Sequence, residues 1–139
     1  MTPGSPVLLD TVAVSNLMRG SAADAPLQAF VAGRDLLVSF VTVGELLFGA
    51  MKRHWGDQRM AELEIRLSSL GVIPGTIGVA REYGRLRAEF GTSKGANDLW
   101  IAGCAIAAKP DPLPLVTADA DFDEICSFAG LELVRVADL

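Results

Sequence analysis

The sequence predicts one α/β domain with a mainly parallel sheet, and three observations support this fold class. The chain has 139 residues, half of them hydrophobic, which suits a single domain with a sizeable core. Several short runs are apolar throughout, which is typical of strands buried on both faces of a parallel sheet. These runs alternate with longer segments of helical periodicity, as they do in chains built from strand–helix–strand units.

Four of the short apolar runs are predicted to form strands. They are too short for helices, and turn-forming residues lie near them. The predicted strands are residues 7–9, 36–39, 113–116 and 131–134, with a short extended link or minor strand at 71–75. Residues 1–6 combine Pro and Gly without periodicity, which predicts a flexible N-terminus before a single domain of residues 7–139.

The segments between the strands carry apolar residues at helical spacing and recognisable start signals. Pro26 fits the first turn of one helix, Thr42 and Glu45 form a capping-box pattern, and Asn97 can cap a third helix. The predicted helices are residues 15–20, 24–31, 42–51, 57–70, 76–90, 97–108 and 123–128.

The helix that follows Asn97 is the most informative of these segments. Residues 99–108 are apolar on every side, and a helix without a polar face belongs in a core. Asp98 therefore lies at the N-terminus of a buried helix. Complementing the helix dipole would alone explain this acid, but three other acids occupy comparable positions.

Those acids are predicted to meet at one edge of the sheet. Asp10 and Asp119 each follow a strand, and Glu45 and Asp98 each open a helix. In a right-handed α/β sheet, strand ends and the following helix starts share an edge, which is where ligands bind. Two local alternatives stay open, since Asp10 suits a turn and the capping box explains Glu45.

Clustered carboxylates indicate a divalent metal ion. They repel one another, and some must be protonated unless a cation is bound. A site made only of oxygen ligands suits Mg²⁺ or Mn²⁺, and such an ion can activate water and stabilise a phosphodiester under attack. The sequence has one histidine, His54, and no glycine-rich phosphate loop, while the GxSxG match at 91–95 follows a charged helix rather than a strand.

Charge and cysteine content restrict the cellular setting. The net charge of −5 argues against nonspecific nucleic-acid binding through overall charge. Cys104 and Cys126 lack metal or redox spacing, which favours reduced, buried thiols in a cytoplasmic protein. No basic segment precedes the first apolar run, as a signal peptide would require, and no apolar run is long enough to span a bilayer.

Basic side chains on two predicted helices are candidate contacts for a phosphate backbone. One group ends the helix that begins near Glu45, and the other lies on the helix of residues 76–90, where a solvated ion-paired surface is the alternative. The candidate RNA-binding residues are Lys52, Arg53, Arg85 and Arg87.

Four short motifs resemble the acidic motifs of PIN-domain ribonucleases. Their order and spacing are most similar to those of the toxin subunits of bacterial VapBC toxin–antitoxin pairs, over residues 7–136. Each motif alone is weak evidence, whereas the four in this order are specific. The motifs are Leu8-Leu9-Asp10-Thr11, Thr42-Val43-Gly44-Glu45-Leu46, Asn97-Asp98-Leu99-Trp100-Ile101-Ala102 and Thr117-Ala118-Asp119-Ala120-Asp121-Phe122.

The resemblance implies a three-layer PIN-like fold and a Mg²⁺-dependent endoribonuclease, with Mn²⁺ as a substitute ion. It also implies a toxin that forms a homodimer and is held inactive by an antitoxin on a separate chain. We expect no membrane partner, since no apolar run is long enough to span a bilayer. By position, Asp10, Glu45 and Asp98 are the core catalytic and metal-binding acids, and both Asp119 and Asp121 fit the place of the fourth acid. The supporting polar residues are Thr11, Asn97 and Thr117.

One departure and two alternatives accompany this interpretation. Members of the family often have Asn or Ser two residues after the first Asp, where this chain has Val12. A catalytically silent PIN-like binding module would keep the same fold. A phosphoacceptor receiver domain would also gather acids and Mg²⁺, but Asp10 is single and no Lys follows Leu113, as a receiver would require.

Overall fold

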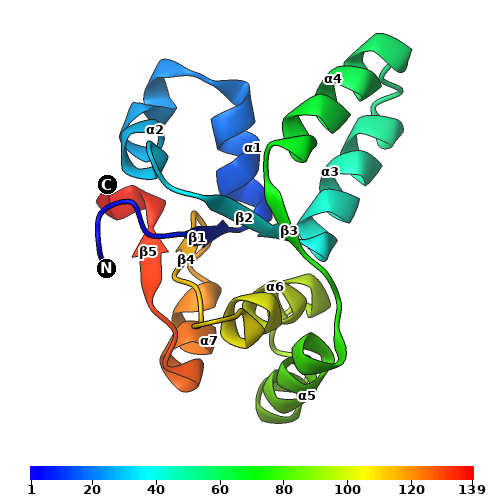
Figure 1. The fold of residues 1–139 in the computed structure, drawn as a ribbon. Coiled ribbons are helices and arrows are strands. Elements are labelled where there is room, and N and C mark those ends of the chain that lie inside the picture. The colour runs from blue at the N-terminus through cyan, green and yellow to red at the C-terminus, as the bar shows by residue number, and fades with distance from the viewer.

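Five short parallel strands form the central sheet of the computed structural model, which describes all of residues 1–139 (Figure 1). The strand order is β3-β2-β1-β4-β5, and every neighbouring pair is parallel. The segment predicted as a link or minor strand is therefore the edge strand β3. The strands are β1 (Val7–Leu9), β2 (Leu36–Ser39), β3 (Gly71–Ile73), β4 (Leu115–Thr117) and β5 (Leu133–Arg135).

Helices cover both faces of this sheet, so the three-layer α/β prediction is confirmed. α1 and α2 lie on one face and α5, α6 and α7 on the other, while α3 and α4 project from the β3 end as a hairpin (Figure 1). The helices are α1 (Thr11–Arg19), α2 (Ala25–Val31), α3 (Phe40–Lys52), α4 (Asp57–Ser68), α5 (Ile77–Phe90), α6 (Ala96–Ala107) and α7 (Phe122–Ala129), with short 3₁₀ turns at Ala22–Asp24 and Val136–Asp138.

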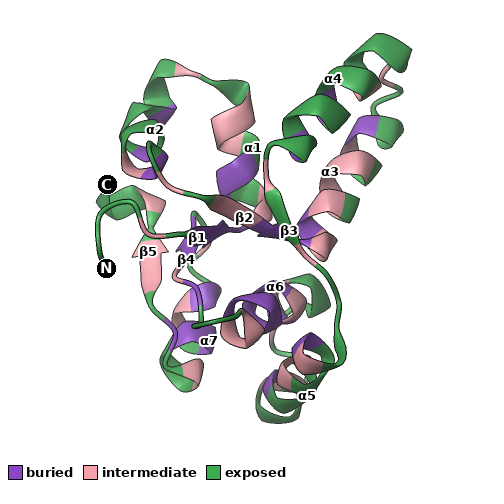
Figure 2. Cartoon of the chain, in the orientation of Figure 1, coloured by how far each residue is buried: buried purple, intermediate pink, exposed green.

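The core consists of two layers that meet at the sheet. In β1, Leu8 joins the cluster under α5, α6 and α7, while Val7 and Leu9 join the cluster under α1 and α2. All three side chains are fully buried, and Figure 2 shows the same burial along the inner strands and α6. Burying each leucine contributes about 2 kcal/mol, which explains why this strand is apolar at every position.

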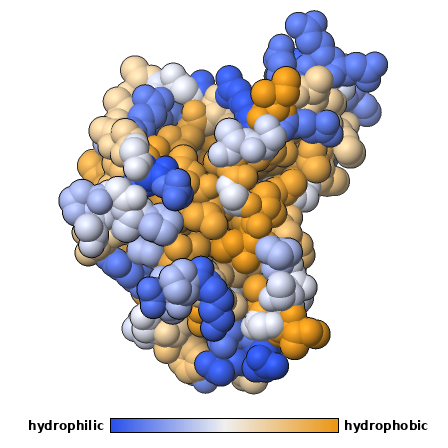
Figure 3. Space-filling view, in the orientation of Figure 1, coloured by the Kyte–Doolittle hydropathy of each residue, from blue (hydrophilic) through white to orange (hydrophobic).

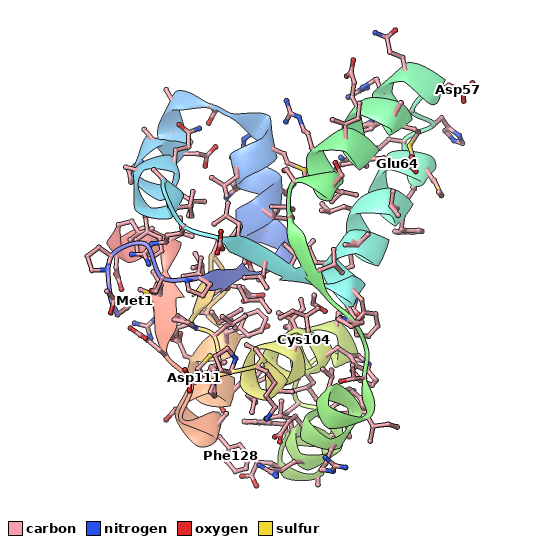
Figure 4. All side chains as sticks on the ribbon, in the orientation of Figure 1. Met1, Asp57, Glu64, Cys104, Asp111 and Phe128 are labelled. Carbon is pink, nitrogen blue, oxygen red and sulfur yellow. The ribbon has the colours of Figure 1, made fainter.

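The α3–α4 hairpin has a small core of its own. Ala50 of α3 packs against Leu63 and Leu67 of α4, so the two helices are held together away from the sheet. Phe48 and Ile65 lie on its outer surface and are exposed. Figure 3 shows hydrophilic residues gathered at the free end of the hairpin, where Figure 4 labels Asp57.

Two helix starts differ from the prediction by two residues or more, each because a residue outside the predicted helix supplies the cap. α1 begins at Thr11 rather than residue 15, because the Asp10 side chain accepts a hydrogen bond from the Ala13 backbone N–H at 2.8 Å. The helix predicted from Thr42 begins at Phe40, because Ser39 Oγ at the end of β2 accepts from the Val41 N–H at 3.1 Å. The capping box of Thr42 and Glu45 is therefore not formed.

The predicted cap at Asn97 is also wrong. α6 begins at Ala96, Gly95 is its N-cap in extended conformation, and no side chain caps this helix. Asn97 is thus exposed within the first turn. The all-apolar helix behind it is the most buried in the molecule, as predicted, with Leu99 and Ala102 fully buried.

Both cysteines are free and buried, as the sequence indicates. Cys104 lies on α6 against the sheet (Figure 4), and its thiol donates to Ser39 Oγ at 3.4 Å. Burial raises the pKa of both thiols, that of Cys126 to about 11. Neither thiol is therefore an activated nucleophile.

The structure contains no α-helix with the length and apolar composition that a membrane span requires.

The N-terminal residues 1–6 contact the domain through Arg34, whose guanidinium donates to the carbonyls of Thr2 and Ser5. That these residues are flexible, and that 7–139 form one unit, stay predictions.

Candidate metal centre

The loops after β1 and β4, the second turn of α3 and the first turn of α6 bring five acids to one edge of the sheet. Asp10 directly follows β1, Asp119 and Asp121 follow β4, and Glu45 and Asp98 lie near the starts of α3 and α6. Carboxylate oxygens of Asp98, Asp119 and Asp121 lie within 4.8 Å of one another. Both candidates for the fourth acid therefore belong to the cluster.

Asp10 is the most buried acid of the site, with 2% of its surface exposed. One carboxylate oxygen caps α1 through the Ala13 N–H, and the other accepts a hydrogen bond from Thr117 Oγ1. Burial raises the pKa of Asp10 and the charge of Asp119 raises it further, whereas the bonds from Thr117 and Ala13 oppose the rise. Asp10 thus caps a helix and also faces the acid cluster.

Thr117 is the central polar group of the β4 loop. Besides donating to Asp10, its Oγ1 accepts from the Asp119 backbone N–H at 2.9 Å. The Asp121 N–H then donates to Asp119 Oδ1 at 2.9 Å. These bonds fix the loop, so the buried hydroxyl couples the conformation of Asp119 to that of Asp10.

We expect Thr117→Val to destabilise the fold by about 1–3 kcal/mol, because it leaves a buried carboxylate oxygen without its donor. Urea unfolding followed by circular dichroism measures this loss. Thr92→Val, at an exposed loop position, is the control and should change stability by less than about 0.5 kcal/mol. Equal stability of the two variants would contradict the role given to the Thr117 hydroxyl.

Glu45 is oriented by α1 rather than by a capping box. Thr11 Oγ1 donates to Glu45 Oε1 at 2.6 Å and lies 3.0 Å from Thr42 Oγ1. Sequence reasoning missed Thr42 as part of this arrangement. The three-residue spacing from Thr42 to Glu45 was the available signal, because residues i and i+3 share a helix face.

The electrostatics of Asp98 tie all five acids together. Its pKa is raised to about 6, first by burial and then by the negative charges of Asp119, Asp121, Asp10 and Glu45. Several like charges within reach of one half-buried carboxylate are unfavourable unless a cation is bound. A set of carboxylate oxygens is also the ligand set that Mg²⁺ and Mn²⁺ prefer, so these residues fit a divalent ion.

Two positions of the site supply fewer polar contacts than the family resemblance implies. Asn97 is exposed and makes no capping bond. Val12 is 49% exposed in the first turn of α1, where an Asn or Ser would supply a further polar group. The supporting role of Asn97 stays a prediction, as do the catalytic and metal-binding roles of the acids.

The structure does not bring the four predicted RNA-binding cations together. Lys52 and Arg53 end α3 in the projecting hairpin, and the Lys52 ammonium lies 5.9 Å from the centre of the Phe48 ring. Arg85 and Arg87 lie on α5, across the sheet from the hairpin's side, where Arg85 pairs with Glu82 at 3.2 Å. Their RNA-binding roles stay predictions.

Arg87 is engaged within its own chain. Its guanidinium donates to Tyr83 Oη at 3.0 Å and to the carbonyls of Gly91 and Lys94. The same Tyr83 ring stacks on Trp100 of α6 with centroids 3.9 Å apart. Arg87 therefore anchors the loop that leads into the helix carrying Asp98.

The protein is a parallel α/β domain in which four separate segments bring acids to one edge of the sheet. This arrangement defines a class of domain suited to binding divalent metal ions. The family model of the PIN domain matches residues 7–127. The chain therefore belongs to the PIN domain family, as the four motifs indicated, and the receiver-domain alternative has no support.

Relatives and solved structures agree with this assignment. Ribonuclease VapC2 of Rickettsia felis is 33% identical over 84 residues, which are 58% of this chain and 63% of that protein, so the match spans less than two thirds of it. The crystal structure of VapBC2 from Rickettsia felis bound to a promoter DNA fragment gives a TM-score of 0.73 at 27% identity, covering 94% of this chain and 98% of that one. DNA-bound VapBC from Salmonella typhimurium gives 0.74 at 25% identity, with coverage of 94% and 98%.

Proposed function

We propose that this chain is a divalent-metal-dependent endoribonuclease and the toxin of a toxin–antitoxin pair. The observation that carries the proposal is the acid cluster of Asp98, Asp119 and Asp121, with Asp10 and Glu45, at the sheet edge of a PIN domain. A relative named as a ribonuclease and a structural neighbour, 29% identical, named as a member of the VapBC family of toxin–antitoxin systems support it.

Asp98, Asp119 and Asp121 are the side chains whose spacing suits a shared ion, and Asp10 and Glu45 complete the negative site. A bound Mg²⁺ or Mn²⁺ supplies positive charge that stabilises a phosphodiester under attack and lowers the pKa of a water molecule. The protein's own part is orientation. Thr117 holds Asp10, and Thr11 holds Glu45.

The partners follow from the same family resemblance. We propose an antitoxin on a separate chain, because a neighbour of this fold at 29% identity is named as a member of the VapBC family of toxin–antitoxin systems. A homodimer in the cytoplasm is the corresponding proposal for the free chain. Exposed Phe48 and Met51 on α3 offer apolar surface for association.

Cleavage of matched RNA and DNA tests this proposal. We expect the purified chain to cut a single-stranded RNA internally in Mn²⁺, to leave it intact in excess EDTA, and to leave DNA of the same sequence intact. Gel analysis of end-labelled strands gives the readout. RNA that is bound but never cut would identify a silent binding module, and full activity in EDTA would contradict the metal mechanism.

A further inference from the structure

A cleft of about 650 Å³ lies between α1 and the α3–α4 hairpin. Thr11 and Glu45 line one part of it and belong to the metal centre. The cleft therefore reaches the metal centre at Glu45, whose charge also acts on Asp98. Its basic lining residues are Arg19, Arg53, Arg59 and Arg66.

Against these four arginines the lining has two acids, Glu45 and Glu62, so the cleft carries net positive charge on a chain whose net charge is −5. Arg19 pairs with buried Asp24 at 3.2 Å, which ties the end of α1 to the turn before α2, and Arg66 of α4 donates to the Met18 carbonyl of α1. Arg53 and Arg59 form no ion pair within the chain. Their charges are available to an anion in the cleft.

An aromatic platform lies beside these two arginines. Trp55 is half-buried against the Ala50 and Leu63 cluster, and the Arg59 guanidinium carbon lies 4.0 Å from the centre of the indole ring. Both groups line the cleft. A stacked indole and guanidinium offer the flat cationic surface on which nucleic-acid bases stack.

We propose that this cleft holds the single-stranded RNA substrate, a proposal that rests on the proposed ribonuclease function. Arg53 and Arg59 contact its phosphates, Trp55 and Arg59 stack a base, and the continuing strand reaches the acids beyond Thr11 and Glu45. An acidic peptide would also suit the arginines, but it has no base to stack on the platform of Trp55 and Arg59. Arg85 and Arg87, on α5, lie outside this path.

Binding of a short fluorescein-labelled single-stranded RNA by the Asp98→Asn chain tests the path without cleavage. We expect the Arg53→Ala/Arg59→Ala variant to bind at least about tenfold more weakly, with a salt slope that is lower by about 0.7 for each lost phosphate contact. Arg53→Lys/Arg59→Lys should keep most of the slope, because both charges remain. Arg81→Ala, an exposed α5 arginine outside the cleft, is the control and should bind RNA like the parent.

Trp55 gives an independent readout. We expect Trp55→Leu to weaken RNA binding about fivefold or more without changing the salt slope, because stacking releases no counterions. Trp55→Phe should keep most of the affinity and also preserves the hairpin packing. Circular dichroism of each variant establishes that the loss is not one of folding.

The results of these experiments distinguish a failure of the proposed RNA-binding path from a failure of the proposed ribonuclease function. If the active chain cuts RNA and the Arg53→Ala/Arg59→Ala chain does so with unchanged KM and salt slope, the path is wrong and the function stands. If the parent chain cuts no RNA, the proposed ribonuclease function is wrong, and the proposed RNA path is wrong with it. Loss of polyglutamate binding in that variant with unchanged RNA affinity would overturn the proposal in favour of a protein partner.

Discussion

Asp98→Asn is expected to lower the rate of RNA cleavage by about a thousandfold or more, because it removes one charged ligand from the proposed metal centre, where a bound ion would activate water. Asp98 is the acid whose pKa responds to all four of the others. The substitution keeps size and shape, so the buried α6 packing should persist. Initial cleavage rates at saturating Mn²⁺ measure the effect.

Asp111→Asn is the matched control for this experiment. Asp111 is an exposed acid in the turn after α6, at the opposite end of that helix from Asp98 (Figure 4). The same chemical change there should leave cleavage within about twofold of the parent, as for most surface substitutions. A comparable loss in both variants, or in neither, would contradict the assignment of Asp98 to the site.

The same substitution should raise thermal stability when no metal is present. In EDTA at neutral pH, we expect Asp98→Asn to melt about 2–6 °C above the parent, because it removes like-charge repulsion and the cost of burying a charge. Mn²⁺ at a hundredfold excess over its Kd should stabilise the parent by about 2.7 kcal/mol and the variant by much less. If Asp98 merely complements the α6 dipole, the variant melts lower in EDTA and gains equally from Mn²⁺.

The pH dependence of this effect has a definite sign. Asp98 has a folded pKa of about 6, above the value of about 3.9 in an unfolded chain. Its contribution favours folding below about pH 4 and is lost as pH rises through 6. Urea unfolding in EDTA at pH 5 and 7.5 should therefore show the parent losing about 1 kcal/mol more than Asp98→Asn, after allowance for solvent screening of a half-exposed group.

The convergence of the acids was predictable because it depends on chain topology more than on local detail. Asp10 and Asp119 follow strands, and Asp98 opens a helix, so right-handed crossovers bring all three to one edge. The helix starts were less predictable. Two local patterns, the capping box of Thr42 and Glu45 and the cap at Asn97, gave way to Ser39 and Gly95.

The role of Arg87 and the arginine-lined cleft were not predicted from the sequence, because both depend on contacts that form only in the folded chain. Arg87 looked like a surface cation, but Tyr83 and the carbonyls of the loop before α6 occupy its guanidinium. The arginine-lined cleft depends on how the α3–α4 hairpin packs against α1, which no sequence period records. Arg66 shows this directly, since its partner is the carbonyl of Met18.

Calorimetric titration of Mn²⁺ into the metal-free chain tests the central claim that these separate acids form one metal site. At pH 6, we expect saturable binding by the parent and by Asp111→Asn, with proton release visible as a heat that depends on the buffer, because Asp98 is partly protonated there. Asp98→Asn should bind at least about tenfold more weakly and release fewer protons. Equal Mn²⁺ affinity and proton release in Asp98→Asn and the parent would contradict the claim.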